Sequence, residues 1–241
     1  METNTTAPII DRVAALDWPS LTTSLDTSGY ALTPAILTPA ECAHLAGLYD
    51  IRDHFRSRVN MARFGYGLGE YKYFGNPLPD VVAQLRAAVY PYLAPLANRW
   101  LSALRFETRF PPVLGEFLEV CHRHGQARPT PLLLRYDAAG YNCMHQDLYG
   151  EIYFPLQLTC LLNRREIDFT GGEFMLAEQR PRAQSRCEAI TLDQGQAVIF
   201  ATRWRPVKGV RRFYRVNVRH GVSTIRSGHR TTLGIIFHDA K

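Results

Sequence analysis

The most informative stretch of this sequence is Tyr136-Asp-Ala-Ala-Gly-Tyr-Asn-Cys-Met-His145-Gln-Asp147. His145 and Asp147 are two residues apart. On an extended strand alternate side chains leave the same face, so both could reach one metal ion. His220, far downstream, would be the third ligand. Two imidazoles and one carboxylate leave coordination positions open on an iron ion, which predicts a reactive rather than a structural metal site.

A cation follows the expected third ligand at a fixed spacing. Arg230 lies ten residues after His220, at the start of an apolar run. A guanidinium can hold a carboxylate through two parallel hydrogen bonds, so Arg230 predicts a seat for a small carboxylic acid. His229 and His238 compete with His220 for the metal. His229 falls in a predicted turn and His238 near the chain end, so His220 is favoured.

Composition limits the class of protein. The 241 residues are 46% hydrophobic and 21% charged, which suits one globular domain with a substantial core. The five cysteines are scattered and form no CxxC pair, which argues against a disulfide framework and favours the reducing cytoplasm. The N-terminus lacks the pattern of a signal peptide, and no apolar run approaches the roughly 20 residues of a membrane span. We therefore expect no membrane association, and no obligate protein partner is evident.

The positive charge is unevenly distributed. The formal net charge is +6, and the segment 203–230 contains no Asp or Glu. Such a run beside an active site favours an anionic partner, nucleic acid being the obvious one, although a solvated basic face is the alternative. The basic residues of this segment are Arg203, Arg205, Lys208, Arg211, Arg212, Arg215, Arg219, Arg226 and Arg230.

The first half of the chain reads as mainly helical. Residues 1–30 look like a loosely held lead-in with a short helix around residues 11–16. Thr38-Pro-Ala-Glu41 has the form of a capping box and predicts a helix to about residue 50. Asp80 can cap a second helix, which Pro91 and Pro95 should break or kink. A third helix is expected over residues 113–122, where the His122-x-His124 pair does not share a helix face and reads as surface histidines.

The second half reads as a succession of short strands separated by glycine-rich turns. Helices followed by antiparallel strands predict an α+β fold, a jelly roll (double-stranded β-helix) with N-terminal helices packed on one face. The domain would span residues 1–241, with a helical part to about 130 and the jelly roll from about 131. The expected strands are 132–136, 153–162, 173–177, 197–200, 213–222 and 231–237, with residues 55–76 a mixture of strand and loop.

These motifs together resemble the Fe(II)/2-oxoglutarate dioxygenases. The spacing from the last ligand to Arg230 is most like the prolyl-hydroxylase branch. The approach to the first ligand is like the AlkB branch, with a Tyr nine residues before His-Gln-Asp. The whole chain resembles a group of bacterial 2-oxoglutarate oxygenases for which oxidative repair of alkylated nucleic acid has been proposed. The motifs are His145-x-Asp147, Gly171-Gly-Glu-Phe174, Gly195-Gln-Ala-Val-Ile-Phe200, His220-Gly-Val222 and Gly228-His-Arg230.

Two departures from the AlkB pattern concern substrate recognition. In that branch an Arg-x-Asn segment follows the last His, whereas Arg215-Val-Asn217 precedes His220 here. The AlkB branch also has an Asn two residues before the Tyr, where this chain has Leu134.

The resemblance implies a role for each motif residue. His145, Asp147 and His220 would hold Fe(II), with no further catalytic side chain assigned. 2-Oxoglutarate would chelate the iron, with its distal carboxylate on Arg230 and a hydrogen bond from Tyr136. O2 would take the last position. Tyr136 as a plain core tyrosine is the alternative.

The segment 63–74 is the best candidate for substrate contact, because it combines glycine, aromatic rings and cations. Arg63, Tyr71 and Tyr73 are the candidate residues, and a loop that simply packs on the jelly roll is the alternative. The leading hypothesis is oxidative demethylation of alkylated DNA or other nucleic acid. The others are a prolyl-hydroxylase-like hydroxylase of a protein side chain or small metabolite, and a binding module with a relic site.

Overall fold

The computed structural model describes residues 7–241. Residues 1–6, on which part of the signal-peptide prediction rests, lie outside it. The helices are α1 (Ile9–Ala14), α2 (Trp18–Ser28), α3 (Pro39–Leu48), α4 (Asp80–Ala103) and α5 (Leu114–Arg123), with short 3-10 helices η1 (Arg52–His54) and η2 (Met61–Phe64). No helix among residues 7–241 has both the length and the apolar composition needed to cross a bilayer.

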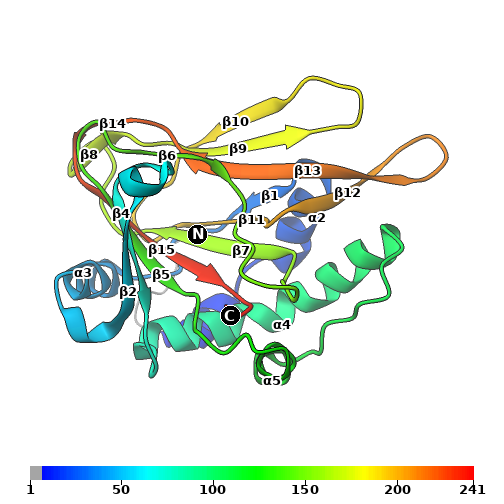
Figure 1. The fold of residues 1–241 in the computed structure, drawn as a ribbon, viewed down its shortest axis with the longest axis horizontal. Helices are drawn as coiled ribbons and strands as arrows, with labels where there is room; N and C mark the ends of the chain where they lie inside the picture. The colour runs from blue at the N-terminus through cyan, green and yellow to red at the C-terminus, as the bar shows by residue number, and fades with distance from the viewer. Residues whose placement is uncertain (1–6) are drawn as a thin grey trace.

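Two antiparallel sheets form the body of the molecule. The seven-stranded major sheet has the order β1-β11-β7-β15-β5-β4-β2, and the minor sheet the order β10-β9-β13-β6-β3, with β12 paired to β13 (Figure 1). The major sheet comprises β1 (Tyr30–Leu32), β2 (Phe55–Asn60), β4 (Glu70–Phe74), β5 (Leu132–Tyr136), β7 (Leu156–Leu161), β11 (Ala197–Ala201) and β15 (Arg230–Ile236). The minor sheet comprises β3 (Gly67–Leu68), β6 (Tyr141–His145), β9 (Phe174–Gln179), β10 (Arg186–Ile190), β12 (Trp204–Lys208) and β13 (Phe213–Val222).

Helices cover one face of the major sheet, as the long helix α4 beneath β5 and β15 shows in Figure 1. Every residue of β15 is buried, because one face of the strand packs under the helices and the other lines the space between the sheets. The small pair β8 (Phe169–Gly171) and β14 (Ile225–Gly228) closes one end. This is the predicted α+β jelly roll with helices on one face, and the fold class is confirmed.

The N-terminal half contributes more strand than its sequence suggests. β1, β2, β3 and β4 all precede residue 130, yet each pairs within the two sheets. The loose lead-in expected over residues 1–30 is wrong for α2, an 11-residue helix that Asp17 caps by accepting a hydrogen bond from Ser20 N. The predicted capping box is present at α3, where Thr38 and Glu41 bond each other's backbone N–H groups.

The sequence predicts a break or kink at Pro91 and Pro95, and the structure shows no break. α4 runs without interruption over 24 residues through both prolines. Both are exposed and four positions apart, so they lie on the solvent side of the helix. The buried side follows a helical period through Leu93, Leu96 and Trp100, and its packing offsets the two lost backbone hydrogen bonds.

Candidate metal centre

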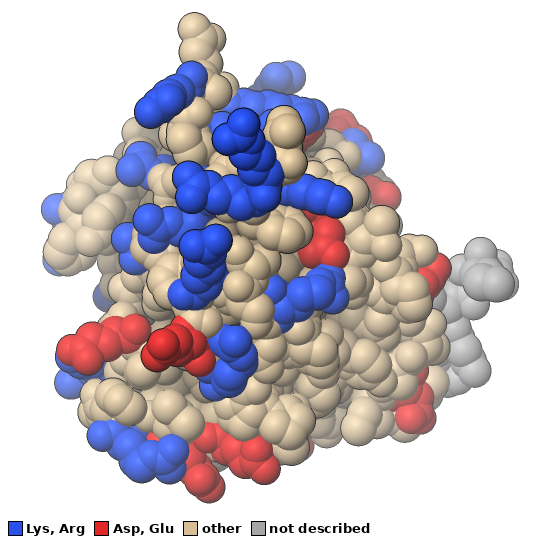
Figure 2. All heavy atoms as spheres, turned by 90° about the vertical axis from the view of Figure 1, so that its right-hand side faces the viewer, with Lys and Arg blue, Asp and Glu red and all other residues tan. Residues whose placement is uncertain are grey.

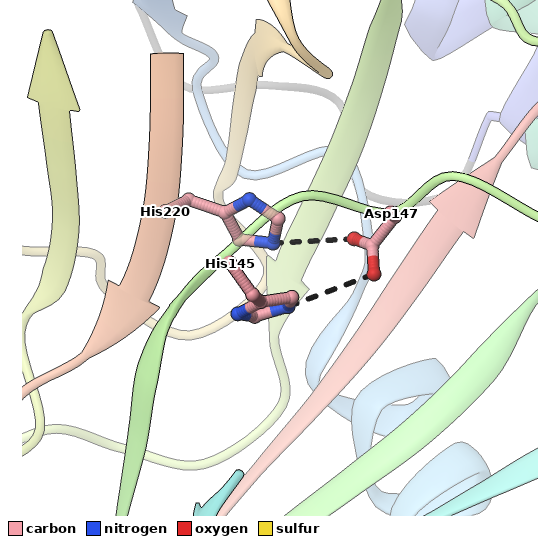
Figure 3. A group of neighbouring side chains, drawn as sticks. All are labelled: His145, Asp147 and His220. Carbon is pink, nitrogen blue, oxygen red and sulfur yellow. Dashed lines mark ion pairs between the residues drawn. The ribbon is translucent and has the colours of Figure 1, made fainter. Parts of the chain in front are cut away.

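Strand pairing places the two histidines opposite each other. His145 is the last residue of β6, and His220 lies on β13 directly across from it in the antiparallel register. Asp147 follows in the loop after β6. Its Oδ1 lies 3.6 Å from His145 Nε2 and its Oδ2 3.2 Å from His220 Nε2 (Figure 3). The three potential ligand atoms all lie within 4.8 Å of one another, and these residues are the only such group in the described chain.

Asp147 reaches this position differently from the prediction. β6 ends at His145, so Asp147 is not on the same strand. The hydroxyl of Tyr149 donates a 2.6 Å hydrogen bond to its Oδ1, and Tyr73 donates a 2.8 Å bond to the Tyr149 oxygen. Contacts from the loop and from β4, rather than strand alternation, orient the carboxylate.

The hydrogen bonds of His145 fix its tautomer. Its Nδ1 lies 2.8 Å from the Cys143 carbonyl oxygen, which can only accept, so Nδ1 carries the proton. In the neutral ring, Nε2 therefore presents its lone pair to the space between the three side chains. This is the arrangement in which an imidazole binds a metal ion.

The surroundings shift the pKa values of the three groups in different directions. Burial raises the pKa of Asp147, but the two histidines outweigh it and hold that pKa well below its usual range. Burial and the neighbouring His145 lower the pKa of His220. Burial also acts to lower the pKa of His145, yet the Asp147 charge reverses the sign and raises it. An ionised carboxylate with a neutral His220 suits a divalent cation.

Arg230 is buried without a full set of partners. It is the first residue of β15, it is 2% exposed, and its Nε and Nη1 form no hydrogen bond. Burial lowers its pKa to about 10, so it stays protonated at neutral pH. An unpaired buried guanidinium is costly, and the fork it presents matches a carboxylate. The distal carboxylate of 2-oxoglutarate fits this requirement.

Tyr136 lies beside Arg230. The two are directly opposite in the β5–β15 pairing, and the Tyr136 hydroxyl accepts a 3.1 Å hydrogen bond from Asn142 Nδ2. Glycines allow both side chains to fit. A Cβ on Gly172 would lie 2.8 Å from Arg230 Cδ, and a Cβ on Gly69 would lie 2.6 Å from the Tyr136 ring.

One cavity of about 570 Å³ joins these groups. The triad side chains come from the minor sheet and the loop after it, whereas Arg230 and Tyr136 come from the major sheet. Four further tyrosines line it, namely Tyr66, Tyr71, Tyr73 and Tyr149. A dicarboxylate held on Arg230 and a metal between the histidines would therefore share one space.

The three residues predicted to contact substrate are separated by the structure. Tyr71 and Tyr73 line the cavity from β4, their rings edge to face at 5.4 Å. Arg63 is exposed on η2 and is not among the lining residues. Tyr66 lies inside the predicted segment 63–74 but was not singled out there; it lines the cavity, is 49% exposed and stacks on Phe64 at 5.5 Å. Sequence reasoning missed Tyr149, whose only sequence signal is that it lies two residues after Asp147.

The other histidines lie apart from the triad. His229 is exposed, and His238 is fully buried and accepts a hydrogen bond from Phe154 N. His122 contacts Asp239 Oδ2 at 3.0 Å and His124 the Val120 carbonyl at 2.9 Å, both from the end of α5.

Known proteins resemble this chain in sequence and in fold. An uncharacterized protein of Mycobacterium tuberculosis is 50% identical over 167 residues, which span 69% of this chain and 72% of the relative. A 2OG-Fe(II) oxygenase family oxidoreductase from Burkholderia pseudomallei has the same fold, with a TM-score of 0.53, 15% identity and 92% of each chain covered. A Pseudomonas putida prolyl-4-hydroxylase matches with a TM-score of 0.50 and 16% identity over 93% of this chain and 99% of its own.

A family model matches residues 69–240, a segment that includes the triad, Arg230 and Tyr136. The family is described as an oxygenase catalysing oxidative methylation of damaged DNA. The match covers well over half of the chain, and the jelly-roll fold agrees with it. The chain therefore belongs to this family of oxygenases.

Proposed function

We propose that this single-domain enzyme is an Fe(II)/2-oxoglutarate-dependent dioxygenase that oxidatively demethylates alkylated nucleic acid. His145, Asp147 and His220 hold the iron, and Arg230 and Tyr136 bind 2-oxoglutarate. The main observation behind this proposal is that a buried, incompletely paired guanidinium and a His-Asp-His group line the same cavity. The family description names damaged DNA, which supports nucleic acid as the substrate.

The bound iron, 2-oxoglutarate and O2 supply the oxidising power for hydroxylation of a C–H bond. That reaction would add one oxygen atom of O2 to a methyl group of the substrate and would convert 2-oxoglutarate to succinate and CO2. The resulting N-hydroxymethyl group decomposes to formaldehyde and the free base. The side chains of the protein orient the reactants. Arg230 neutralises the distal carboxylate, Asn142 fixes the Tyr136 hydroxyl, and Tyr149 holds one oxygen of Asp147.

The aromatic lining of the cavity suits a planar substrate. Tyr71 and Tyr73 form one wall, and the exposed Phe64–Tyr66 pair stands beside it on the segment from η2 to β3. Aromatic side chains stack on bases that leave the helix or are single-stranded. We assign base contact to Tyr66, Tyr71 and Tyr73 and not to Arg63.

We also propose a cytoplasmic location. The five cysteines are unpaired, and two of them, Cys143 and Cys187, are exposed, which suits a reducing compartment that contains nucleic acid.

The test is formaldehyde release with Fe(II) and 2-oxoglutarate on N-methylated single-stranded DNA, duplex DNA and RNA. Succinate and formaldehyde should form in equal amounts. His145→Ala and Arg230→Gln should each lower kcat/KM for 2-oxoglutarate at least about 100-fold, the second mainly by raising KM. If the enzyme released no formaldehyde from any methylated nucleic acid, the proposal would be wrong.

The spacing of His220 and Arg230 supports one alternative, hydroxylation of a protein side chain or small metabolite. Peptides and free amino acids belong in the same screen. Succinate formed with a peptide and without formaldehyde would favour that alternative. Its rate should depend weakly on salt, whereas nucleic-acid binding weakens steeply.

A further inference from the structure

Two hairpins leave the minor sheet at the same end. β9 and β13 pair from Phe174–Val222 to Gln179–Asn217. Beyond that last pair, β9 continues into the turn before β10, and β13 is entered from the turn after β12. Adjacent strands of a sheet run along nearly the same line, so both turns project from the same end of the sheet. They form the long extensions at the right of Figure 1.

Both hairpins are strongly basic. Neither 180–186 nor 203–215 contains an Asp or Glu. Arg205 differs from the other basic residues of these hairpins because it is buried. It pairs with Glu178 and donates hydrogen bonds to the carbonyls of Asp26 and Thr27. Lys and Arg gather over the upper part of the face in Figure 2. We define the hairpin surface as Arg180, Arg182, Arg203, Lys208, Arg211, Arg212 and Arg215, none of which forms an ion pair within residues 7–241.

An aromatic ring lies within this surface. The guanidinium carbons of Arg203 and Arg215 lie 3.9 and 4.7 Å from the centroid of the Trp204 ring, and Phe106 stacks on the same ring at 6.0 Å. Stacked guanidiniums are held in place and keep their hydrogen-bond donors free. Arginines arranged in this way suit phosphate groups.

The hairpin surface is connected to the triad. Gln146, between His145 and Asp147, donates to Asn217 Oδ1 at 2.8 Å and to the Val218 carbonyl at 2.7 Å. Asn217 lies opposite Trp204 in the β12–β13 pairing. From His220, β13 runs seven positions to Phe213, which is about 23 Å at 3.3 Å per residue.

We propose that the hairpin surface binds the phosphodiester backbone of the nucleic acid whose modified base enters the cavity. This rests on the proposed function. At about 3.4 Å per nucleotide, a stacked strand spans the distance from His220 to Phe213, which directly follows one hairpin turn, in about seven nucleotides. Oligonucleotides shorter than this should fill the cavity without reaching the tips.

The test measures fluorescence anisotropy of unmodified, labelled 20-mer and 5-mer single-stranded DNA. The enzyme is kept with Fe(II) and 2-oxoglutarate without oxygen, and salt is varied. The triple variant Lys208→Gln, Arg211→Gln, Arg212→Gln should bind the 20-mer at least about tenfold more weakly at low salt. The slope of log Kd against log salt should fall by about 2, and binding of the 5-mer should stay unchanged.

A matched control removes the same charge elsewhere. Arg52→Gln, Arg123→Gln and Arg128→Gln are exposed substitutions on η1, on α5 and in the loop after α5, and they should leave the slope nearly unchanged. Equal weakening by the two triple variants would overturn the inference. So would a 20-mer bound no more tightly than a 5-mer, or wild type that binds anionic phospholipid vesicles and not DNA.

Catalysis separates this inference from the proposed function. The hairpin variant should still release formaldehyde from a methylated 5-mer at the wild-type rate. If wild type binds the 20-mer through the hairpins yet releases no formaldehyde from any nucleic acid, the proposed function fails and the surface assignment stands.

Discussion

Asp147 has a different partner on each carboxylate oxygen. Oδ1 accepts the hydrogen bond of Tyr149, while Oδ2 lies 3.2 Å from His220 Nε2. With one oxygen engaged by a phenol, the carboxylate is set to offer the other to a metal. Hydrogen bonds of this kind orient ligands and tune metal affinity.

Tyr149→Phe should therefore weaken Fe(II) binding by about 10- to 100-fold while leaving the fold intact. Anaerobic titration with Fe(II), followed by equilibrium dialysis, measures this directly and does not depend on turnover. Tyr90→Phe is the matched control, since its buried hydroxyl bonds the Pro111 carbonyl, away from the cavity. Equal affinities in the two variants would show that Tyr149 does not position Asp147.

His238 predicts a pH dependence of stability. Burial lowers its pKa from 6.5 to about 4, and Phe154 N donates to its Nδ1, which must stay unprotonated. In the unfolded chain His238 binds a proton below about pH 6.5, whereas in the folded chain it binds one only below about pH 4. Stability is therefore lost as pH falls through this window, by roughly 3 kcal/mol in total.

His238→Asn keeps an acceptor for Phe154 N and removes the titration. Urea unfolding at pH 7 and pH 4.5 should show a smaller loss for this variant than for wild type, by about 2 to 3 kcal/mol. The same loss in both proteins would mean that other groups carry the acid sensitivity.

At the scale of elements, Glu41 joins two helices. It completes the capping box of α3 and accepts from both terminal nitrogens of Arg12 on α1, at 2.6 and 2.8 Å. The Arg12 side chain is 6% exposed. Removing Glu41 therefore opens a cap and leaves a buried charge unpaired.

Thr38→Ala should cost about 1 kcal/mol of unfolding free energy, whereas Glu41→Ala should cost about 3 kcal/mol or more. Chemical denaturation measures both. Arg12→Met combined with Glu41→Ala should be less destabilising than Glu41→Ala alone, because no charge is then stranded. If the double variant has a lower unfolding free energy than Glu41→Ala, the unpaired Arg12 charge does not explain the destabilisation.

The elements also show what sequence can predict. β5 and β13 match their predicted bounds, and α3 begins at its capping box, because short apolar runs between turn signals and capping residues specify them. α2 was missed because its Thr- and Ser-rich turns have weak helix propensity and its stability comes from packing.

α4 passes through two prolines for a related reason, since burial of its other side outweighs the local signal. In the candidate site, His145, Asp147, His220 and Arg230 were identified from spacing. Tyr149 could not be, because its role depends on the path of a loop and on Tyr73 from a distant strand.

At the scale of the whole molecule, the proposed site joins the two sheets. His145 and His220 belong to the minor sheet, and Arg230 and Tyr136 to the major sheet. 2-Oxoglutarate chelating a metal at one end and paired with Arg230 at the other would connect them across the cavity. Ligands that bind only the folded state stabilise it, by about 2.7 kcal/mol at 100 times their Kd.

Thermal unfolding without oxygen should resolve this connection into two steps. Fe(II) alone should raise the Tm, and 2-oxoglutarate should raise it by a further 5 to 10 °C, roughly, at 100 times its Kd, because about 1 kcal/mol corresponds to 2–4 °C in a chain of this size. Without metal, 2-oxoglutarate should have little effect. In Arg230→Gln the first step should remain and the second should largely disappear. The comparison uses the increments and not the starting Tm, since removing a buried charge can itself change stability. A full second increment in Arg230→Gln would show that the co-substrate does not span the two sheets through this residue.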